Sequence, residues 1–101
     1  MYLQVTISAE TQAQAGQILN SLLEKKLVTG GQIIHAPARF LWKNKITNMD
    51  YFTINSFTIE KNKAAVVEDV KRNSIEEIPM VWFFEIDGND ELLKWIKETL
   101  K

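Results

Sequence analysis

The chain has 101 residues, of which 46% are hydrophobic and 25% are charged, so it has the size and balance of one globular domain. Its formal net charge of −1 argues against a broad electrostatic surface for nucleic acid. It contains no cysteine, which excludes disulfides, thiolate zinc sites and cysteine nucleophiles. We therefore expect a single domain spanning residues 1–101.

The N-terminal segment starts directly with alternating residues and has no basic stretch followed by an apolar run, so we expect no signal peptide. No apolar run approaches the roughly 20 residues that cross a bilayer. The sequence thus predicts a cytoplasmic protein with no membrane partner.

The first elements in chain order are a strand and a helix. Residues 2–8 alternate as a strand does, and either Ser8 or Thr11 could cap the following helix. From residue 10 to 26 the apolar residues recur on one helical face. We interpret Gly30 and Gly31, which follow, as the bend that leads into the next strand rather than as a phosphate-binding loop.

The middle of the chain predicts a hairpin. Extended structure is expected over residues 32–36 and again over 40–42, with Pro37 interrupting or edging it. A tight turn over 43–45 leads into a long strand over 46–59, rich in Thr, Tyr, Phe and Ile.

The last third predicts a helix over 60–72, a strand over 80–86, a turn over 87–90 and an amphipathic helix over 92–100. The continuous apolar run of the strand indicates burial on both faces or an oligomer contact.

Taken together, the elements follow the order β-α-β-β-α-β with an extra C-terminal helix. This order predicts an α+β, ferredoxin-like domain, in which helices cover one face of an antiparallel sheet. The aromatic residues of the other face need cover, and a second copy of the chain would supply it.

Three local strings, taken with this order, carry a family resemblance. They are the helix exit Leu22–Val28, the hairpin Phe40–Ile46 and the start of the last helix, Asn89–Trp95. The hairpin is similar to an aromatic-aromatic-Trp-x-Gly-x-Ile pattern and the helix to Asn-x-x-Tyr-Leu-x-Trp. The chain resembles the CutA divalent-cation tolerance proteins over essentially its whole length. The resemblance implies a homotrimer with a non-catalytic role in metal-ion response.

The departures from the family pattern concern the metal ligands. The family's Cys matches a position near Gly30, its hairpin Gly matches Asn44, and its loop His matches Asn73. Only Glu76 of the loop motif is kept, with Pro79 shifted by one residue. Because Cys and His best suit soft or borderline metals, their absence makes copper binding doubtful.

The acidic residues offer a weak metal site. Glu76 and Glu77 could bind a hard divalent cation through oxygen, and an enzyme hypothesis would bring Asp87 or Asp90 into the same pocket. We favour a solvated loop and helix capping instead. We expect no catalytic residue and no certain cofactor, with a divalent metal ion as the one possibility.

The resemblance also indicates a cleft between subunits, with Trp42, Tyr51 and Glu76 as candidate lining residues. Trp82 and Trp95, like Trp42, are more often core or interface residues than functional ones.

The remaining candidates are weaker. His35 is the only histidine, and without convergent partners it is best interpreted as structural. The basic residues Arg39, Lys43 and Lys45 near aromatic side chains could contact nucleic acid, but a solvated hairpin tip fits the net charge better. The alternative to the CutA-like role is a PII-like regulatory module that binds a small ligand or nucleotide between subunits.

Overall fold

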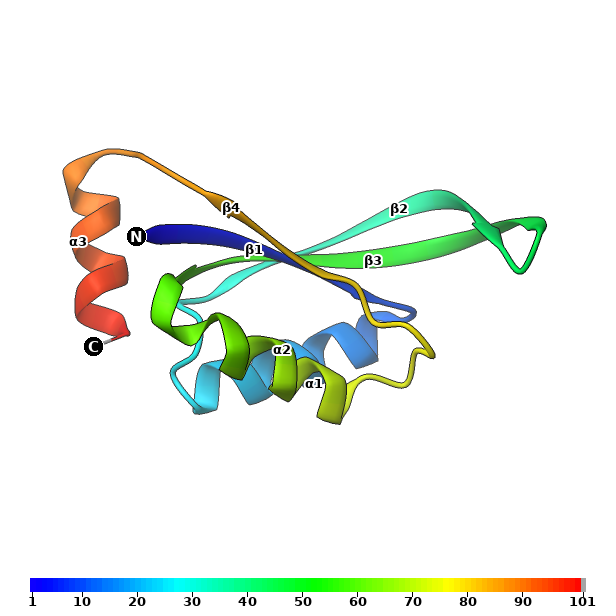
Figure 1. Cartoon of the computed structure of the whole chain (residues 1–101), viewed down its shortest axis with the longest axis horizontal. Helices are drawn as coiled ribbons and strands as arrows, with labels where there is room; N and C mark the ends of the chain where they lie inside the picture. The colour runs from blue at the N-terminus through cyan, green and yellow to red at the C-terminus, as the bar shows by residue number, and fades with distance from the viewer. Residues whose placement is uncertain (101) are drawn as a thin grey trace.

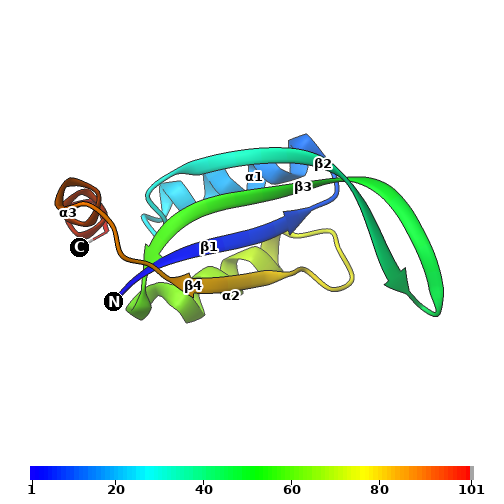
Figure 2. The ribbon, with the colours of Figure 1, turned by 90° about the horizontal axis from the view of Figure 1, so that it is seen from above.

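The computed structural model describes residues 1–100, and its elements follow the predicted order. They are β1 (Tyr2–Ala9), α1 (Gln12–Glu24), β2 (Gly31–Trp42), β3 (Lys45–Ile59), the 3-10 turn η1 (Glu60–Asn62), α2 (Lys63–Asn73), β4 (Val81–Glu85) and α3 (Asp90–Thr99). The strands form one antiparallel sheet in the order β2-β3-β1-β4 (Figures 1 and 2). With α1 and α2 on one face, this is the predicted ferredoxin-like α+β fold. The predicted domain, 1–101, extends one residue beyond the described part.

The hydrophobic core lies between the sheet and the two helices α1 and α2, which Figure 1 shows below the sheet. Alternate residues of β1 point into it, because successive side chains of a strand face opposite sides. The helices contribute residues four positions apart, which lie on one helical face. Its fully buried members include Val5, Ile7, Ile18, Leu22, Ile54, Val66 and Val70. None of the helices within residues 1–100 is long and apolar enough to cross a membrane.

Two residues, Ser8 and Thr11, were candidates for the N-cap of α1. The Thr11 hydroxyl accepts a hydrogen bond from the Gln14 backbone N–H at 3.1 Å. Ser8, the other candidate, lies inside β1 and has a different role described below. Thr11 therefore supplies the N-cap.

The hairpin of β2 and β3 is longer than the rest of the sheet. β1 ends at Ala9, opposite Phe52, so the hairpin continues beyond that point as a two-stranded ribbon. We call its outer part, residues 37–50, the outer ribbon; Figure 1 shows it projecting from the body. Its two-residue turn holds Lys43 and Asn44 at φ 50° and 65°, as a tight hairpin turn requires.

Pro37 does not interrupt β2, which runs unbroken from Gly31 to Trp42. Of the two alternatives for Pro37, the interruption is wrong and the edge position is confirmed, because β2 is an edge strand, where a residue without an N–H is tolerated. The expected bend is confirmed, however: Gly30 has φ 131° and β2 begins at Gly31. A Cβ on Gly31 would lie 2.2 Å from the Asn55 carbonyl oxygen, so the close approach of these strands requires glycine there.

β4 occupies the other edge of the sheet, and a single chain does not bury it on both faces. Phe83 packs against the core, whereas Trp82 is 39% and Phe84 57% exposed. Of the two interpretations of its apolar run, burial within the chain is therefore wrong, and an oligomer contact remains.

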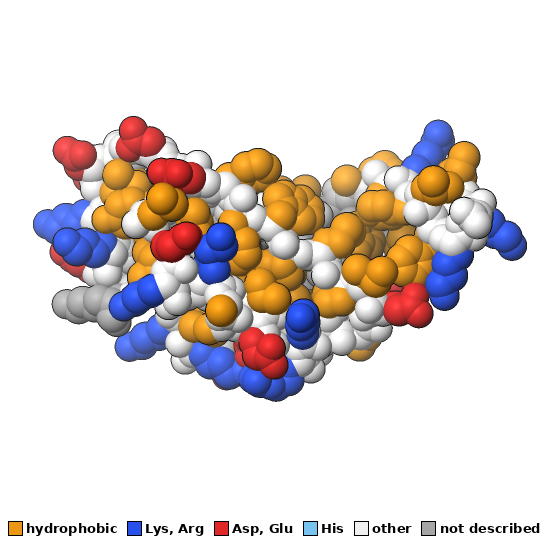
Figure 3. Space-filling view, viewed as in Figure 1, with side chains coloured by type: hydrophobic (Ala, Val, Ile, Leu, Met, Phe, Trp, Pro, Cys, Tyr) orange, Lys and Arg blue, Asp and Glu red, His pale blue; other side chains and the backbone are white. Residues whose placement is uncertain are grey.

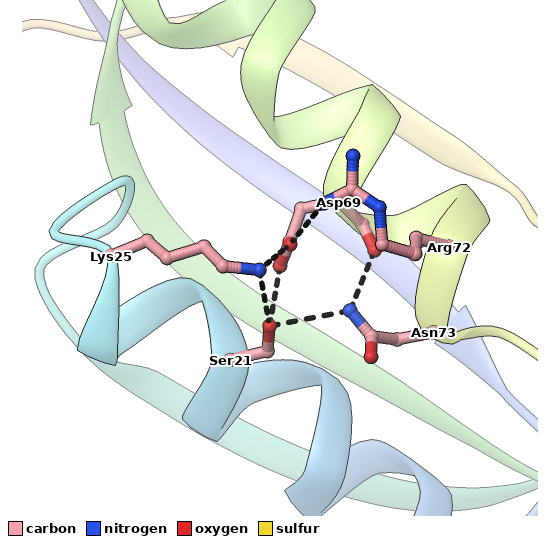
Figure 4. A network of polar contacts seen from close by, with 5 residues as sticks. All are labelled: Ser21, Lys25, Asp69, Arg72 and Asn73. Carbon is pink, nitrogen blue, oxygen red and sulfur yellow. Dashed lines mark hydrogen bonds and ion pairs between the residues drawn. The ribbon is translucent and has the colours of Figure 1, made fainter.

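A polar network joins α1 to α2 (Figure 4). Asp69, which is 2% exposed, pairs with Lys25 and accepts a hydrogen bond from the Ser21 hydroxyl at 2.8 Å. Arg72 approaches the same carboxylate at 3.6 Å. The Asn73 side-chain amide donates to the Asp69 backbone carbonyl at 2.8 Å and to the Ser21 hydroxyl at 3.2 Å. The buried carboxylate is thus fully partnered.

We predict that Asp69→Ala lowers the free energy of unfolding by about 2–3 kcal/mol, because it removes the acceptor of the Ser21 hydroxyl and the counter-charge of Lys25. The measurement is denaturant unfolding at one fixed protein concentration. Glu68→Ala, at the exposed neighbouring position of α2, is the control and should change stability by less than about 0.5 kcal/mol. Equal effects of the two substitutions would contradict the prediction.

Candidate functional site

Ser8, Tyr51 and Glu76 form a hydrogen-bonded cluster, which we call the Glu76 clamp. The Tyr51 hydroxyl donates to one carboxylate oxygen of Glu76. The Ser8 hydroxyl donates to the other oxygen at 2.8 Å. Three separate segments, β1, β3 and the loop between α2 and β4, are therefore tied together through one carboxylate.

The clamp lies where β3 loses its neighbour β1. Tyr51 is the first residue of β3 beyond the pair that Phe52 makes with the end of β1. The loop over residues 74–80 crosses this point and is held there by reciprocal bonds: the Ser8 N–H donates to the Met80 carbonyl at 2.9 Å, and the Met80 N–H donates to the Ser8 hydroxyl at 2.9 Å. The loop thus covers the root of the outer ribbon.

The rest of the loop is anchored from the helix side. The Ile75 N–H donates to the Gln14 side-chain oxygen at 3.0 Å, and the Gln14 amide donates to the Asn73 carbonyl at 3.1 Å. Gln14 is 4% exposed, so it connects α1 to this loop from the interior. Its side-chain amide both donates and accepts, which satisfies the backbone of an irregular segment.

Tyr51 is 6% exposed. Burial, followed by its hydrogen bond to Glu76 and the charges of Glu76 and Glu10, raises the pKa of the Tyr51 phenol above its ordinary value. Tyr51 consequently stays protonated and donates its proton to Glu76. The ring of Phe40 on the outer ribbon packs edge-on against the Tyr51 ring, with centroids 5.2 Å apart. The phenol therefore works as a fixed donor and not as a base.

The structure brings together two of the three predicted cleft residues. Tyr51 and Glu76 are in contact, whereas Trp42 ends β2 opposite Lys45, six residues farther along the hairpin. Trp42 is 39% exposed, and the ammonium of Lys43 lies 5.5 Å from its ring centroid. A cleft that contained all three residues would need another chain to bridge this distance.

The predicted carboxylate pair does not converge. Glu76 accepts the two hydroxyls of the clamp, while Glu77 is exposed and lies 3.5 Å from the ammonium of Lys43. Asp87 follows the other end of β4 and Asp90 begins α3, the helix that Figure 1 shows at the end of the molecule away from the projecting hairpin. Residues 1–100 hold no group of three or more His, Asp or Glu side chains able to bind a metal ion. The enzyme hypothesis that brought these carboxylates into one pocket is therefore wrong.

The positions that match the family's soft ligands have structural partners instead. Asn73 belongs to the network of Figure 4. The Gly30 carbonyl accepts a hydrogen bond from the Ser56 hydroxyl in the bend before β2. Neither residue offers a side chain that binds copper or zinc.

His35 and the basic residues of the hairpin occupy exposed positions. The His35 ring stacks on Phe52 with centroids 4.7 Å apart, and its Nε2 lies 3.4 Å from Asp50. These contacts fit the structural role that we expected for His35. Arg39, Lys43 and Lys45 all lie on the outer ribbon, as expected for a hairpin tip.

Sequence reasoning missed Ser8 and Gln14. Ser8 is a polar residue in a largely apolar strand, and the alternation of that strand indicates only that Ser8 lies near its end. Its side-chain partners Glu76 and Met80 are 68 and 72 residues away in the sequence, so only the fold reveals them.

We predict that Tyr51→Phe lowers the free energy of unfolding by about 1–2 kcal/mol near neutral pH, because Glu76 loses one donor. It should also remove a pH effect. The folded state holds the Tyr51 proton more tightly than the unfolded state, so this contribution is complete below the unfolded pKa of about 10 and is lost as pH rises above it.

The measurement is denaturant unfolding of the wild type and the variant from pH 8 to 11. The control is Tyr2→Phe, which removes the other tyrosine and should retain the steep fall above pH 10. Parallel curves for the wild type and Tyr51→Phe would contradict the assigned role of Tyr51.

The chain is similar to known proteins in sequence and in fold over nearly its whole length. The model of the CutA1 divalent ion tolerance protein family matches residues 3–99. The structure of the periplasmic divalent cation tolerance protein CutA from Archaeoglobus fulgidus is 30% identical, with a TM-score of 0.96 and 100% of both chains covered. The divalent cation tolerance protein from Thermus thermophilus is 21% identical, with a TM-score of 0.94 over 100% of both chains.

CutA1 from Oryza sativa is 20% identical, with a TM-score of 0.92, covering 99% of this chain and 94% of its own. At these lower identities the likeness is one of fold. Among curated protein sequences no match is found.

Proposed function

Because this chain belongs to the CutA1 divalent ion tolerance family, we propose that it is a non-catalytic homotrimer that acts in the response to divalent metal ions. The observation that supports a homotrimer is the amount of apolar surface that one copy leaves exposed to solvent. The role in metal-ion response rests on the family match over residues 3–99. We also propose that the protein acts in the cytoplasm, although the Archaeoglobus fulgidus relative is named as periplasmic.

A single copy is more extended than a compact monomer. Its accessible surface is 6548 Å², whereas a compact monomer of 11.7 kDa would expose about 5900 Å². Its radius of gyration is 14.1 Å, against about 12.7 Å for a compact domain of this length. The excess surface is what a subunit of an oligomer would present.

The uncovered surface is apolar in two regions. The open face of the sheet and its β4 edge expose Ile34, Trp82 and Phe84, and the outer ribbon exposes Leu41, Trp42 and Ile46. Figure 3 shows hydrophobic side chains both across the body and along the hairpin. A two-stranded ribbon is marginally stable in water by itself. Contact with further copies would cover both regions, and a threefold ring gives each copy the same contacts.

The clamp supports a non-catalytic role. A general base needs a free carboxylate near substrate, but both oxygens of Glu76 accept hydrogen bonds from Ser8 and Tyr51. A metal ion at Glu76 and Glu77 would have to displace these hydroxyls and the Lys43 pair. We therefore propose a metal-ion response that works through the assembled protein rather than through a resident metal. The PII-like alternative gains no support from the family match or from the solved structures.

We predict that sedimentation equilibrium gives a mass three times the 11.7 kDa of one chain. Leu41→Asp combined with Ile46→Asp should lower the mass toward one chain, because both side chains are 76% exposed in a single copy and carry no core role there. Ile75→Asp, at another exposed apolar position in the loop before β4, is the control. A wild-type mass near 11.7 kDa at every concentration would contradict the homotrimer.

We predict that a strain lacking this gene grows less well than its parent in excess divalent metal salts. A plasmid copy of the wild type should restore growth, and the Leu41→Asp, Ile46→Asp copy should not, because the assembly is required. Growth curves with copper, zinc and magnesium salts are the measurement, with sodium chloride of equal ionic strength as the control. Equal growth of parent and deletion strain in all three metals would contradict the proposed role.

A further inference from the structure

The segment between β4 and α3 contains the one Asp-Gly pair of the chain, Asp87–Gly88. Both residues are exposed and belong to no helix or strand. Figure 1 shows the segment (orange) leading away from the sheet to α3, at the end of the molecule away from the hairpin. Short exposed segments between two elements open locally at almost no cost in free energy. We therefore expect the backbone of this pair to sample conformations that a helix or strand forbids.

The backbone is held on either side of the pair but not at the pair itself. Ile86, just before it, donates its N–H to the Tyr2 carbonyl at 3.0 Å. The next backbone hydrogen bond along the chain joins the Leu93 N–H to the Asn89 carbonyl at 3.2 Å. Within residues 1–100, no backbone-to-backbone hydrogen bond involves residue 87 or 88. The pair can thus rotate without breaking a backbone bond of the sheet or of α3.

The Asp87 carboxylate already lies against the backbone nitrogen that follows it. The Gly88 N–H donates to Asp87 Oδ1 at 2.8 Å. Gly88 has no side chain to shield this nitrogen and restricts the backbone less than any other residue. A rotation about the bonds of Asp87 therefore brings its carboxyl carbon, Cγ, within reach of the nitrogen. This is the arrangement from which an aspartate cyclises onto its own main chain.

The other aspartates of the chain lack these features. Asp50 lies in β3 and is followed by the buried Tyr51. Asp69 and Asp90 belong to α2 and α3, where the backbone is held in the helical conformation. None of the three is followed by glycine, and no asparagine of the chain is either. Mobility, exposure and an unshielded nitrogen therefore coincide at Asp87.

We propose that Asp87 is a site of spontaneous covalent modification, at which aspartate converts to isoaspartate through a succinimide. The Gly88 nitrogen attacks Cγ of the protonated Asp87 carboxyl group. The N–Cγ bond forms, a Cγ–O bond breaks, and the amide proton leaves with the hydroxyl group as water. Water then opens the succinimide ring. Opening at Cγ restores aspartate, whereas opening at the main-chain carbonyl carbon of Asp87 leaves the chain linked through Cγ, which is isoaspartate.

The product changes the connection that carries α3. An isoaspartyl linkage places the Asp87 Cβ in the main chain, so the connection between β4 and α3 gains one methylene group. At one end of it β4 is paired with β1, and at the other α3 is held by Ile96 and Leu100, which are 0% and 3% exposed. Because the longer linkage joins two fixed points, α3 should pack less firmly on the sheet. The free carboxylate that results is a substrate for enzymes that methylate isoaspartate.

The test ages the purified, assembled protein at neutral pH for several weeks and digests it with trypsin. Cleavage after Arg72 and Lys94 releases residues 73–94 as one peptide. Electron-transfer fragmentation locates isoaspartate within the peptide, and methylation by a purified isoaspartyl methyltransferase measures its amount. The reference is the same peptide made by synthesis. Because the segment opens at almost no cost, the protein should form isoaspartate at Asp87 within about threefold of the rate in the free peptide.

Two variants and a matched control test the route. Gly88→Ala should lose most of the product because a side chain hinders the nitrogen, and Asp87→Glu should lose it because the longer carboxyl group would have to form a larger ring. A Cβ on Gly88 would lie 3.1 Å from Leu92 Cδ2, the end of a flexible side chain, so the first variant should fold. The control, Asp90→Glu, changes another exposed carboxylate of the same peptide and should keep the product. Circular dichroism confirms that each variant is folded.

Three results would overturn the modification site. The first is aged protein without isoaspartate under conditions in which the free peptide forms it, because the segment would then be held in an unreactive conformation. The second is isoaspartate at Asp90 and not at Asp87. The third is an equal yield from the wild type and from Gly88→Ala.

Hydrogen exchange tests the effect on α3. Amides of residues 90–100 should exchange faster in aged than in fresh wild-type protein, whereas aged Gly88→Ala should exchange as its fresh form does. Equal exchange in aged and fresh wild type, with isoaspartate present, would overturn the loosening of α3 and leave the modification site standing. Neither part depends on the proposed role in metal-ion response, so each can fail without affecting that role.

Discussion

The structure depends on one constraint, which is that two short helices cover only one face of a sheet whose hairpin outruns its other strands. α1 and α2 bury Val5, Ile7 and Ile54 completely on that face. They cannot reach the opposite face or the outer ribbon, so Trp82 and Phe84 stay exposed to solvent. Leu41 and Ile46 of the outer ribbon are exposed for the same reason. A core of this size stabilises a domain modestly, and the uncovered surface is therefore where further stability has to come from. One chain forms the complete fold, but it leaves apolar side chains of the sheet and of the hairpin exposed to solvent.

The Glu76 clamp lies at the point where β3 loses one of its two neighbouring strands, and it ties the chain together there. β3 loses β1 at Phe52, and from there only β2 supports it. Ser8 and Tyr51 lie on either side of that point, and the Glu76 carboxylate joins them. The loop 74–80 that carries Glu76 is also bonded to Ser8 through Met80. Because the loop is also held by Gln14 from α1, the direction in which the ribbon leaves the body is coupled to the helical layer. Such coupling would hold the outer ribbon in a defined orientation relative to the body of the domain.

The sequence predicts the part of the fold that rests on local periodicity, and it fails where a residue's role depends on distant partners. Alternation and helical spacing located every main element within a few residues. Pro37 left two alternatives open, an interrupted strand or an edge strand, and only the sheet order shows that β2 is an edge strand that tolerates proline. The Tyr51–Glu76 contact agrees with the family resemblance, but Ser8 looked like a helix cap, since its partners at Glu76 and Met80 come from the far end of the chain. Only the enzyme hypothesis, which we did not favour, joined the four candidate carboxylates in one site, and the sequence does not show that β4 separates them.

The residues in the family's soft-ligand positions take part in structural contacts of this fold. Gly30 takes a backbone conformation that a side chain would strain, at the bend that lets Gly31 approach Asn55. The Asn73 side-chain amide donates to the Asp69 backbone carbonyl and to the Ser21 hydroxyl, in the network that joins α1 to α2. Each position thus has a structural task, and restoring Cys or His there would disturb a contact that the fold uses. Under the proposed function, a role in metal-ion response would reside in the sheet, the projecting hairpin and the apolar surfaces that they leave uncovered.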